Sequence, residues 1–239
     1  MTGLGDTITL EIYIKGHEMK FIKLSLSVAL ITTMAFAEEA KKSDFGVSAN
    51  MAVTSNYIWR GMTQSNNSPA VQGGVDLEYK GLYLGTWGSN VDFGDTKNSL
   101  EADFYGGYKR ELYGIGFDIG AVQYAYPNMS NEYNFAEAYL GISKEWEKFG
   151  VKAKYSKGIE TNDLNPEDCW EVGASAKLPY NVGFSATYGD YYNIGAYYSV
   201  GLNRAFEKFE LSVAYTDFNH ETDSSADEDN VVGTVTFRF

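Results

Sequence analysis

Apolar and polar residues alternate with a period of two along most of this 239-residue chain. In the stretch 45–54 every second residue is apolar, and comparable alternation returns about every eighteen residues or less up to Phe239. Such alternation indicates β-strands that place one face in an apolar and the other in a polar environment. We count twelve segments, at residues 44–60, 70–80, 82–93, 99–110, 114–125, 134–145, 149–159, 169–178, 181–189, 192–204, 208–218 and 230–239. No useful helical period interrupts them, so the sequence predicts an all-β chain.

The connections between these segments alternate in length. Tight turns are expected at Lys80-Gly81, Glu111 to Tyr113, Trp146 to Lys148, Pro179-Tyr180 and Ala205 to Lys208. Most of the others are longer and polar, such as MTQSNNSP, YPNMSNEYN and NHETDSSADED, and only the connection near Asp190 is short. Short turns at one rim and long loops at the other are typical of outer-membrane barrels, whose strand number is usually even. The pattern therefore predicts a closed antiparallel transmembrane β-barrel of about twelve strands, with both ends of the mature chain at the periplasmic rim.

Aromatic residues gather near both ends of the expected strands. Those that flank the tight turns are Trp146, Phe149, Tyr180, Phe206 and Phe209, and those near the long loops are Tyr57, Trp59, Phe93, Tyr126, Tyr133, Trp170, Tyr191 and Phe218. Tyr and Trp rings prefer the membrane interface, so two such girdles indicate outer-membrane lipid around the barrel. A soluble secreted all-β domain would also alternate, but it has no reason to crowd aromatic residues at both strand ends.

The start of the chain predicts export. Residues 19–37 read MKFIKLSLSVALITTMAFA, with a basic start, a short apolar stretch and a small-x-small pattern, so we expect a signal peptide cleaved after Ala37. Residues 1–18 precede this layout and are interpreted as a leader upstream of a true start at Met19; the alternative is a short N-terminal strand. Residues 38–43 would form a short periplasmic segment and residues 44–239 the barrel domain.

Composition excludes several classes of function. The formal net charge of -13 argues against binding of nucleic acid, because such binding requires clustered Lys and Arg. A single cysteine, Cys169, excludes an intramolecular disulfide and a metal site of paired thiolates. We expect neither a cofactor nor a metal.

Four stretches of the mature chain resemble a known family. They are SNYIWRGMTQSNNSPAVQGG (55–74), GLYLGTWGSNVDF (81–93), YAYP (124–127) and NFAEAYLG (134–141). Over most of residues 45–239 the chain resembles the TorF family of bacterial porins. The resemblance implies an outer-membrane barrel of a Gram-negative bacterium, and it carries no functional residue over to this chain.

The face expected to line the lumen is charged and net acidic. By their phase, the candidates are Asp76, Glu78, Glu101, Asp103, Asp118, Glu137, Lys152, Lys154, Glu171, Lys177, Glu210 and Arg238, with Lys80 and Lys109 among them. We expect a porin-like channel in which small hydrophilic solutes, cations above all, diffuse passively through a narrow lumen. The alternative is a non-conducting structural or adhesive outer-membrane barrel that acts through its extracellular loops, while these charges pair and fill the interior. Homo-oligomerisation is left open.

Three further features have a plain and a functional interpretation. Arg60 is expected to be an exposed rim residue paired with a carboxylate, or else a cation at a constriction or a contact for an anion. His220, the one histidine of the mature chain, lies near Asp217, but no nucleophile motif accompanies them, so a surface hydrolase is disfavoured and we predict no enzyme. The acidic stretch 217–229 lacks the spacing of a calcium loop and is interpreted as a solvated, mobile loop.

The last nine residues, VVGTVTFRF, form a strand pattern that ends on Phe239. This strand is expected to pair with the first one, because an open edge is not tolerated in a membrane. The terminal aromatic residue resembles the C-terminal signature that the outer-membrane assembly machinery recognises, so Phe239 is expected to be both a rim anchor and an assembly signal.

Overall fold

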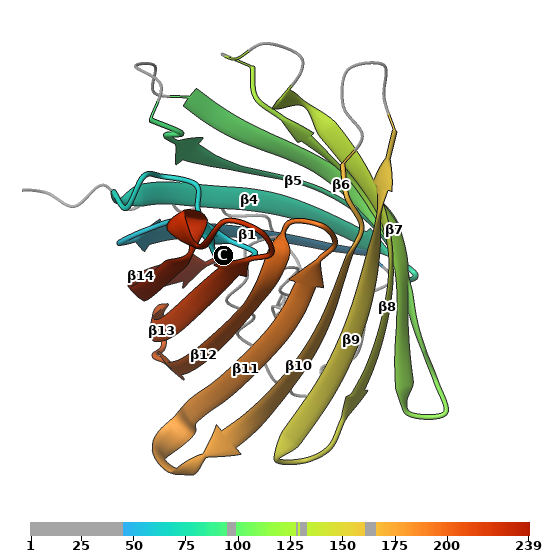
Figure 1. Ribbon diagram of the computed structural model, residues 1–239. Coiled ribbons are helices and arrows are strands. Elements are labelled where there is room, and N and C mark those ends of the chain that lie inside the picture. The colour runs from blue at the N-terminus through green and yellow to red at the C-terminus, as the bar shows by residue number, and fades with distance from the viewer. Residues whose placement is uncertain (1–44, 95–98, 128, 130–132, 161–165) are drawn as a thin grey trace, which may run out of the picture.

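Twelve long antiparallel strands close into one barrel (Figure 1). The computed structural model describes residues 45–94, 99–127, 129, 133–160 and 166–239. The barrel strands are β1 (Phe45–Thr54), β4 (Ala70–Tyr79), β5 (Leu82–Val91), β6 (Ser99–Leu112), β7 (Ile115–Ala125), β8 (Phe135–Glu145), β9 (Phe149–Ile159), β10 (Cys169–Leu178), β11 (Val182–Tyr191), β12 (Gly195–Ala205), β13 (Phe209–His220) and β14 (Glu228–Arg238). The predicted fold class and strand number are confirmed. The leader, the signal peptide with its cleavage site at Ala37, and residues 38–43 lie outside the described residues.

The barrel closes where the last strand meets the first. Strand β14 pairs with β1 in the register Met51↔Phe237, and β1 pairs on its other side with β4. Backbone hydrogen bonds continue this pairing past β14, with Phe239 N 2.8 Å from Ala49 O and Ala49 N 3.1 Å from Phe239 O. All twelve strands therefore have a partner on both sides, which a sheet surrounded by lipid requires.

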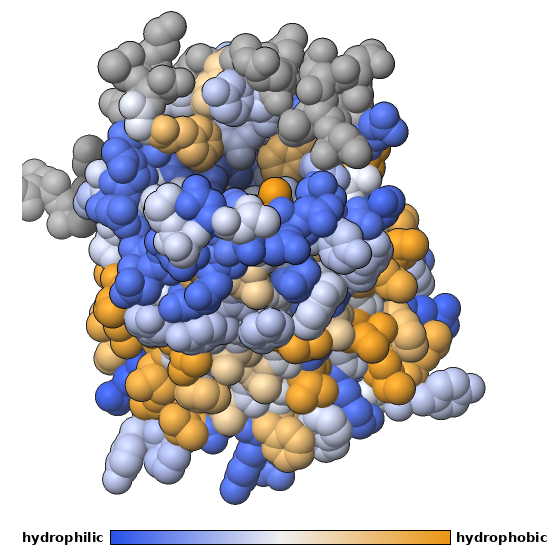
Figure 2. Space-filling model, in the orientation of Figure 1, coloured by the Kyte–Doolittle hydropathy of each residue, from blue (hydrophilic) through white to orange (hydrophobic). Residues whose placement is uncertain are grey.

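The two faces of the sheet differ as the alternation predicts. In β4, Val75 and Leu77 are exposed on the outer face, while Asp76 and Glu78 are half-buried on the inner one. Figure 2 shows hydrophobic residues gathered over the lower part of the visible face, below a broad hydrophilic zone that contains the β13–β14 connection. Within the described ranges, no helix is long and apolar enough to cross a bilayer.

The predicted C-terminal end of the first strand is wrong. Most bounds agree with the prediction to within a few residues, but the segment expected at 44–60 leaves the barrel wall at Thr54. The Thr54 hydroxyl donates to Asn56 O, and the chain then forms a short hairpin from β2 (Ile58–Trp59) and β3 (Met62–Thr63). We call residues 55–69 the lumen hairpin, because the contacts described below place them inside the barrel.

Candidate functional site

The lumen hairpin reverses direction at Arg60 and Gly61. Their φ angles are 50° and 84°, and two consecutive positive φ values are what a tight type I′ hairpin turn requires. A Cβ atom on Gly61 would lie 2.8 Å from the Cβ atoms of both Phe218 and Tyr197, which belong to β13 and β12. The tip of the hairpin is thus packed directly against the inner wall, where only a glycine fits.

Hydrogen bonds fix the hairpin to distant parts of the barrel mouth. The backbone N–H of Thr63 donates to Glu228 Oε2 of β14 at 2.8 Å, and Asn56 Nδ2 donates to Asn230 Oδ1 at 3.0 Å. On another side, the backbone N–H of Asp92, just after β5, donates to Gln64 O at 2.8 Å. The hairpin therefore crosses the lumen near the long-loop rim instead of projecting from it.

Arg60 joins the hairpin to β8. Its Nη2 atom donates to Glu137 Oε2 at 2.8 Å, and the two side chains are 2% and 1% exposed. The guanidinium carbon also lies 4.3 Å from the ring centre of Trp59 and 4.6 Å from that of Tyr191, distances typical of cation–π contacts. Arg60 has a carboxylate partner, but it lies inside the barrel and not at an exposed rim. This corrects the expectation, because the segment that carries Arg60 folds inward.

Two further carboxyl groups lie beneath the hairpin on β6. Glu101 is 2% exposed and its Oε1 accepts a hydrogen bond from the Tyr57 hydroxyl at 3.1 Å. Asp103 is fully buried, and in the register of the sheet it lies opposite Trp87 of β5 and Tyr124 of β7. Within the described part of the chain, Glu101 Oε2 and both Asp103 oxygens have no hydrogen-bond partner.

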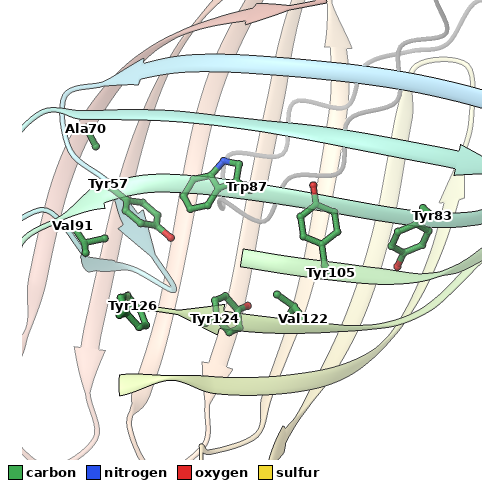
Figure 3. Close-up of a cluster of buried hydrophobic side chains, with 9 residues drawn as sticks. All are labelled: Tyr57, Ala70, Tyr83, Trp87, Val91, Tyr105, Val122, Tyr124 and Tyr126. Carbon is green, nitrogen blue, oxygen red and sulfur yellow. The ribbon is translucent and has the colours of Figure 1, made fainter. Parts of the chain in front are cut away.

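Aromatic side chains form a buried cluster at the same level of the barrel (Figure 3). Tyr57 makes an edge-to-face contact with Trp87, with ring centres 5.4 Å apart, and both belong to a buried cluster that also contains Tyr105, Tyr124 and Tyr126. Figure 3 shows Tyr57 reaching from the hairpin toward the β5 wall. The hairpin and these aromatic rings therefore occupy part of the long-loop half of the interior.

Towards the short turns, polar side chains form smaller pairs on the inner wall. The Tyr83 hydroxyl donates to Asp118 Oδ1 at 2.7 Å and the Tyr105 hydroxyl donates to Asp76 Oδ1 at 2.6 Å. Ion pairs join Lys109 to Glu78 at 3.0 Å, Lys154 to Glu171 at 3.4 Å and Arg238 to Glu210 at 3.2 Å. The side chain of Lys154 is 42% exposed although it lies on the inner face in the middle of β9. Solvent therefore reaches the interior at this level.

The structure places the candidate pore-lining residues on the inner side of the sheet. Those that are buried or half-buried there are Asp76, Glu78, Glu101, Asp103, Asp118, Glu137, Lys152, Lys154, Glu171, Glu210 and Arg238. Lys177 has the same phase in β10 as Glu171 but is exposed near the short turn, and Lys80 is exposed within a turn. The hairpin that covers part of this surface is the element that the strand pattern does not predict.

Asp217 and His220 do not meet in the structure. They differ by three positions along β13, so they point to opposite faces of the sheet. Asp217 Oδ1 accepts from Asn219 Nδ2, while Nδ1 of His220 accepts the backbone N–H groups of Thr222 and Asp223. In a Ser-His-Asp triad, Nδ1 of the histidine donates a hydrogen bond to a carboxylate. In His220 this atom instead accepts hydrogen bonds from the backbone.

The acidic connection between β13 and β14 folds on itself. Asp223 accepts hydrogen bonds from the hydroxyl and the backbone N–H of Ser225, and these bonds hold the pKa of Asp223 below its usual value. Among the residues that the structure describes, no group of three or more His, Cys, Asp or Glu side chains could hold a metal ion.

Comparisons with known proteins give a family and a set of similar folds. The model of a family described as "Bacterial protein of unknown function (Gcw_chp)" matches residues 38–238. No match was found among the curated proteins, and the resemblance to the TorF family stays an expectation.

Several solved outer-membrane proteins share the fold. A structure titled "KdgM porin" has a TM-score of 0.57 at 8% identity, covering 80% of this chain and 98% of that one. A NanC porin structure has a TM-score of 0.51 at 8% identity, covering 81% and 98%. Outer membrane phospholipase A from Escherichia coli has a TM-score of 0.50 at 11% identity, covering 80% and 95%. At these identities the likeness extends to the barrel fold alone.

Proposed function

The protein belongs to the Gcw_chp family of bacterial proteins of unknown function, and we propose that it is an outer-membrane channel. Small hydrophilic solutes would diffuse passively through its net-acidic lumen in the outer membrane of a Gram-negative bacterium. The signal peptide at 19–37, the periplasmic position of both termini and recognition of Phe239 by the assembly machinery are parts of the same proposal. The protein acts without catalysis in this scheme, because Asp217 and His220 face opposite sides of β13.

The observation that carries the proposal is the partly exposed pairing of charges inside the barrel. Lys154 is 42% exposed on the inner face, and Lys109 and Glu78 are 23% and 22% exposed in their ion pair. A barrel whose interior were packed solid by side chains would bury these groups. Charged side chains that line an aqueous space are the usual basis of ion selectivity, so the acidic excess favours cations.

The lumen hairpin forms the narrowest level of the proposed path. Its tip packs on Tyr197 and Phe218, and Arg60 reaches Glu137 on a different part of the wall. A solute that enters from the long-loop rim must pass this level before it reaches the solvent-exposed inner wall near Lys154. The hairpin therefore limits the size of the solute.

Single-channel recording tests the proposal. Refolded protein in planar bilayers between unequal KCl solutions at pH 8 is expected to give discrete conductance steps and a reversal potential that favours K⁺. The variant Glu78→Gln should move the reversal potential toward zero and Lys154→Gln should move it away from zero, because they change the lumen charge in opposite directions. No steps from protein that migrates as a folded barrel on unheated gels would overturn the channel. A reversal potential that favours Cl⁻ would overturn the cation preference.

A further inference from the structure

The lumen hairpin covers two carboxyl groups that have no ion-pair partner in the described part of the chain. Glu101 and Asp103 are 2% and 0% exposed, and three of their four oxygens lack a hydrogen-bond partner in the described part of the chain. Two other inner carboxyls, Asp76 and Asp118, also accept a bond from a tyrosine hydroxyl, as Glu101 does, but they remain half-buried. The fully buried pair Glu101 and Asp103 lies at the level of the hairpin.

The hairpin itself provides the cover. The hydroxyl of Tyr57 reaches Glu101, and the Tyr57 ring packs on Trp87, the register partner of Asp103. If the hairpin left the lumen, Tyr57 would leave with it and this side of both carboxyl groups would face the lumen solvent. The covered state and the open state therefore differ in how well water reaches Glu101 and Asp103.

Among the residues that the structure describes, the titratable and charged groups around the two carboxyls do not neutralise them. They are Tyr57 from the hairpin, Tyr105 from β6, Tyr124 and Tyr126 from β7, and beyond these Arg60 and Glu137; β5 contributes the non-titratable Trp87 and Ser89. The cation among them, Arg60, is bonded to Glu137 and stacked on Trp59 and Tyr191. No ion pair between described residues includes Glu101 or Asp103.

We propose that the lumen hairpin is a proton-controlled plug, seated while Glu101 and Asp103 hold at least one proton and displaced from the lumen when both are ionised. An ionised carboxylate that is buried without a partner is strongly unfavourable, whereas a protonated carboxyl group is neutral and can donate a hydrogen bond. The seated state binds the protons more tightly than the open state. A rise in pH therefore shifts the equilibrium toward the open state, by up to about tenfold per pH unit for each proton released.

The contacts of the hairpin with Glu137, Glu228 and Asn230 oppose this displacement. These contacts do not involve Glu101 or Asp103. Their strength therefore sets the pH at which the hairpin leaves the lumen, whereas ionisation of Glu101 and Asp103 makes it leave as the pH rises. The inference extends the proposed channel function by assigning its regulation. The seating of the hairpin can be measured whether or not the barrel conducts.

Cysteine labelling measures the seating directly. Gln64 is 9% exposed within the hairpin, so Gln64→Cys in a Cys169→Ala background reports whether a charged, membrane-impermeant thiol reagent reaches it. The exposed loop position in Ser225→Cys is the reference for the intrinsic pH dependence of the thiol. Between pH 5 and pH 8 the labelling rate at position 64, divided by that at 225, is expected to rise at least tenfold. In the same background Glu101→Gln with Asp103→Asn should keep this ratio low and flat.

The matched control is Asp118→Asn, which removes an inner carboxyl that is only half-buried and bonded to Tyr83 rather than to the hairpin, and it should preserve the pH response. The plug proposal would be overturned if the labelling ratio followed the same pH course with and without the Glu101→Gln and Asp103→Asn changes. It would also be overturned if position 64 were labelled faster in the doubly substituted protein. Conductance recorded on the same samples separates the two proposals. A pH-dependent labelling ratio without conductance steps would reject the channel proposal and support the plug proposal. Conductance steps with a labelling ratio that does not change with pH would support the channel proposal and reject the plug proposal.

Discussion

Replacement of Glu137 by alanine is expected to destabilise the seated hairpin by about 3 to 5 kcal/mol, the usual cost of leaving one partner of a buried ion pair uncompensated. The Arg60–Glu137 pair is almost completely buried, at 2% and 1% exposure, so water cannot replace the lost carboxylate while the hairpin stays seated. Two measurements check this: urea unfolding in lipid vesicles for the barrel as a whole, and the labelling rate of Gln64→Cys for the hairpin.

The double variant Arg60→Met with Glu137→Leu is the control for this prediction. It removes both charges and keeps much of the side-chain volume, so it should recover most of the loss, as buried pairs replaced by apolar residues often do. If Glu137→Ala changed neither the unfolding midpoint nor the labelling rate, the pair would contribute no more than an exposed surface pair, which is worth about 0 to 1 kcal/mol. The interpretation of Arg60 as the anchor of the hairpin would then be wrong.

The barrel wall was predictable because its pattern is local. In β4 and β13 apolar and polar side chains alternate over most of the strand, and each strand needs only a lipid-facing and a lumen-facing side to be recognised. The same rule predicted which residues face inward, including Glu137 and Lys154. It could not predict how far the interior is filled, because the strand pattern holds no information about what crosses the lumen.

The lumen hairpin was missed because its first residues imitate a strand. Residues 55–60 read SNYIWR, in which Tyr57 and Trp59 keep the apolar phase of β1, although Ser55 and Ile58 depart from it. What turns the chain inward is a set of distant contacts, such as those of Arg60 with Glu137, 77 positions away, and of Thr63 with Glu228, 165 positions away. One local signal existed: a glycine after Arg60, which permits a tight turn between Ile58-Trp59 and Met62-Thr63. Alone it is too weak to end a strand.

Replacement of the lumen hairpin by a short Gly-Ser linker between Thr54 and Ala70 is expected to raise the conductance several-fold and to remove its pH dependence. Strands β1 and β4 pair from Thr54↔Ala70 onward, so a linker can connect them without disturbing the wall. The removed segment includes Arg60 and Tyr57, which fill the narrowest level, and its loss leaves Glu101 and Asp103 open to solvent. Single-channel recordings at pH 5 and pH 8, with solutes of graded size, measure both effects.

The β13–β14 connection offers a matched control for this excision. Residues 221–227 also link two neighbouring strands at the long-loop rim, but most of them are exposed. Their replacement by a Gly-Ser linker should leave both the conductance and its pH dependence unchanged. An equal rise in conductance from both replacements would mean that loops restrict the entrance in general. An unchanged conductance after removal of the hairpin would place the narrowest level elsewhere, among the inner charges between Glu78 and Lys154.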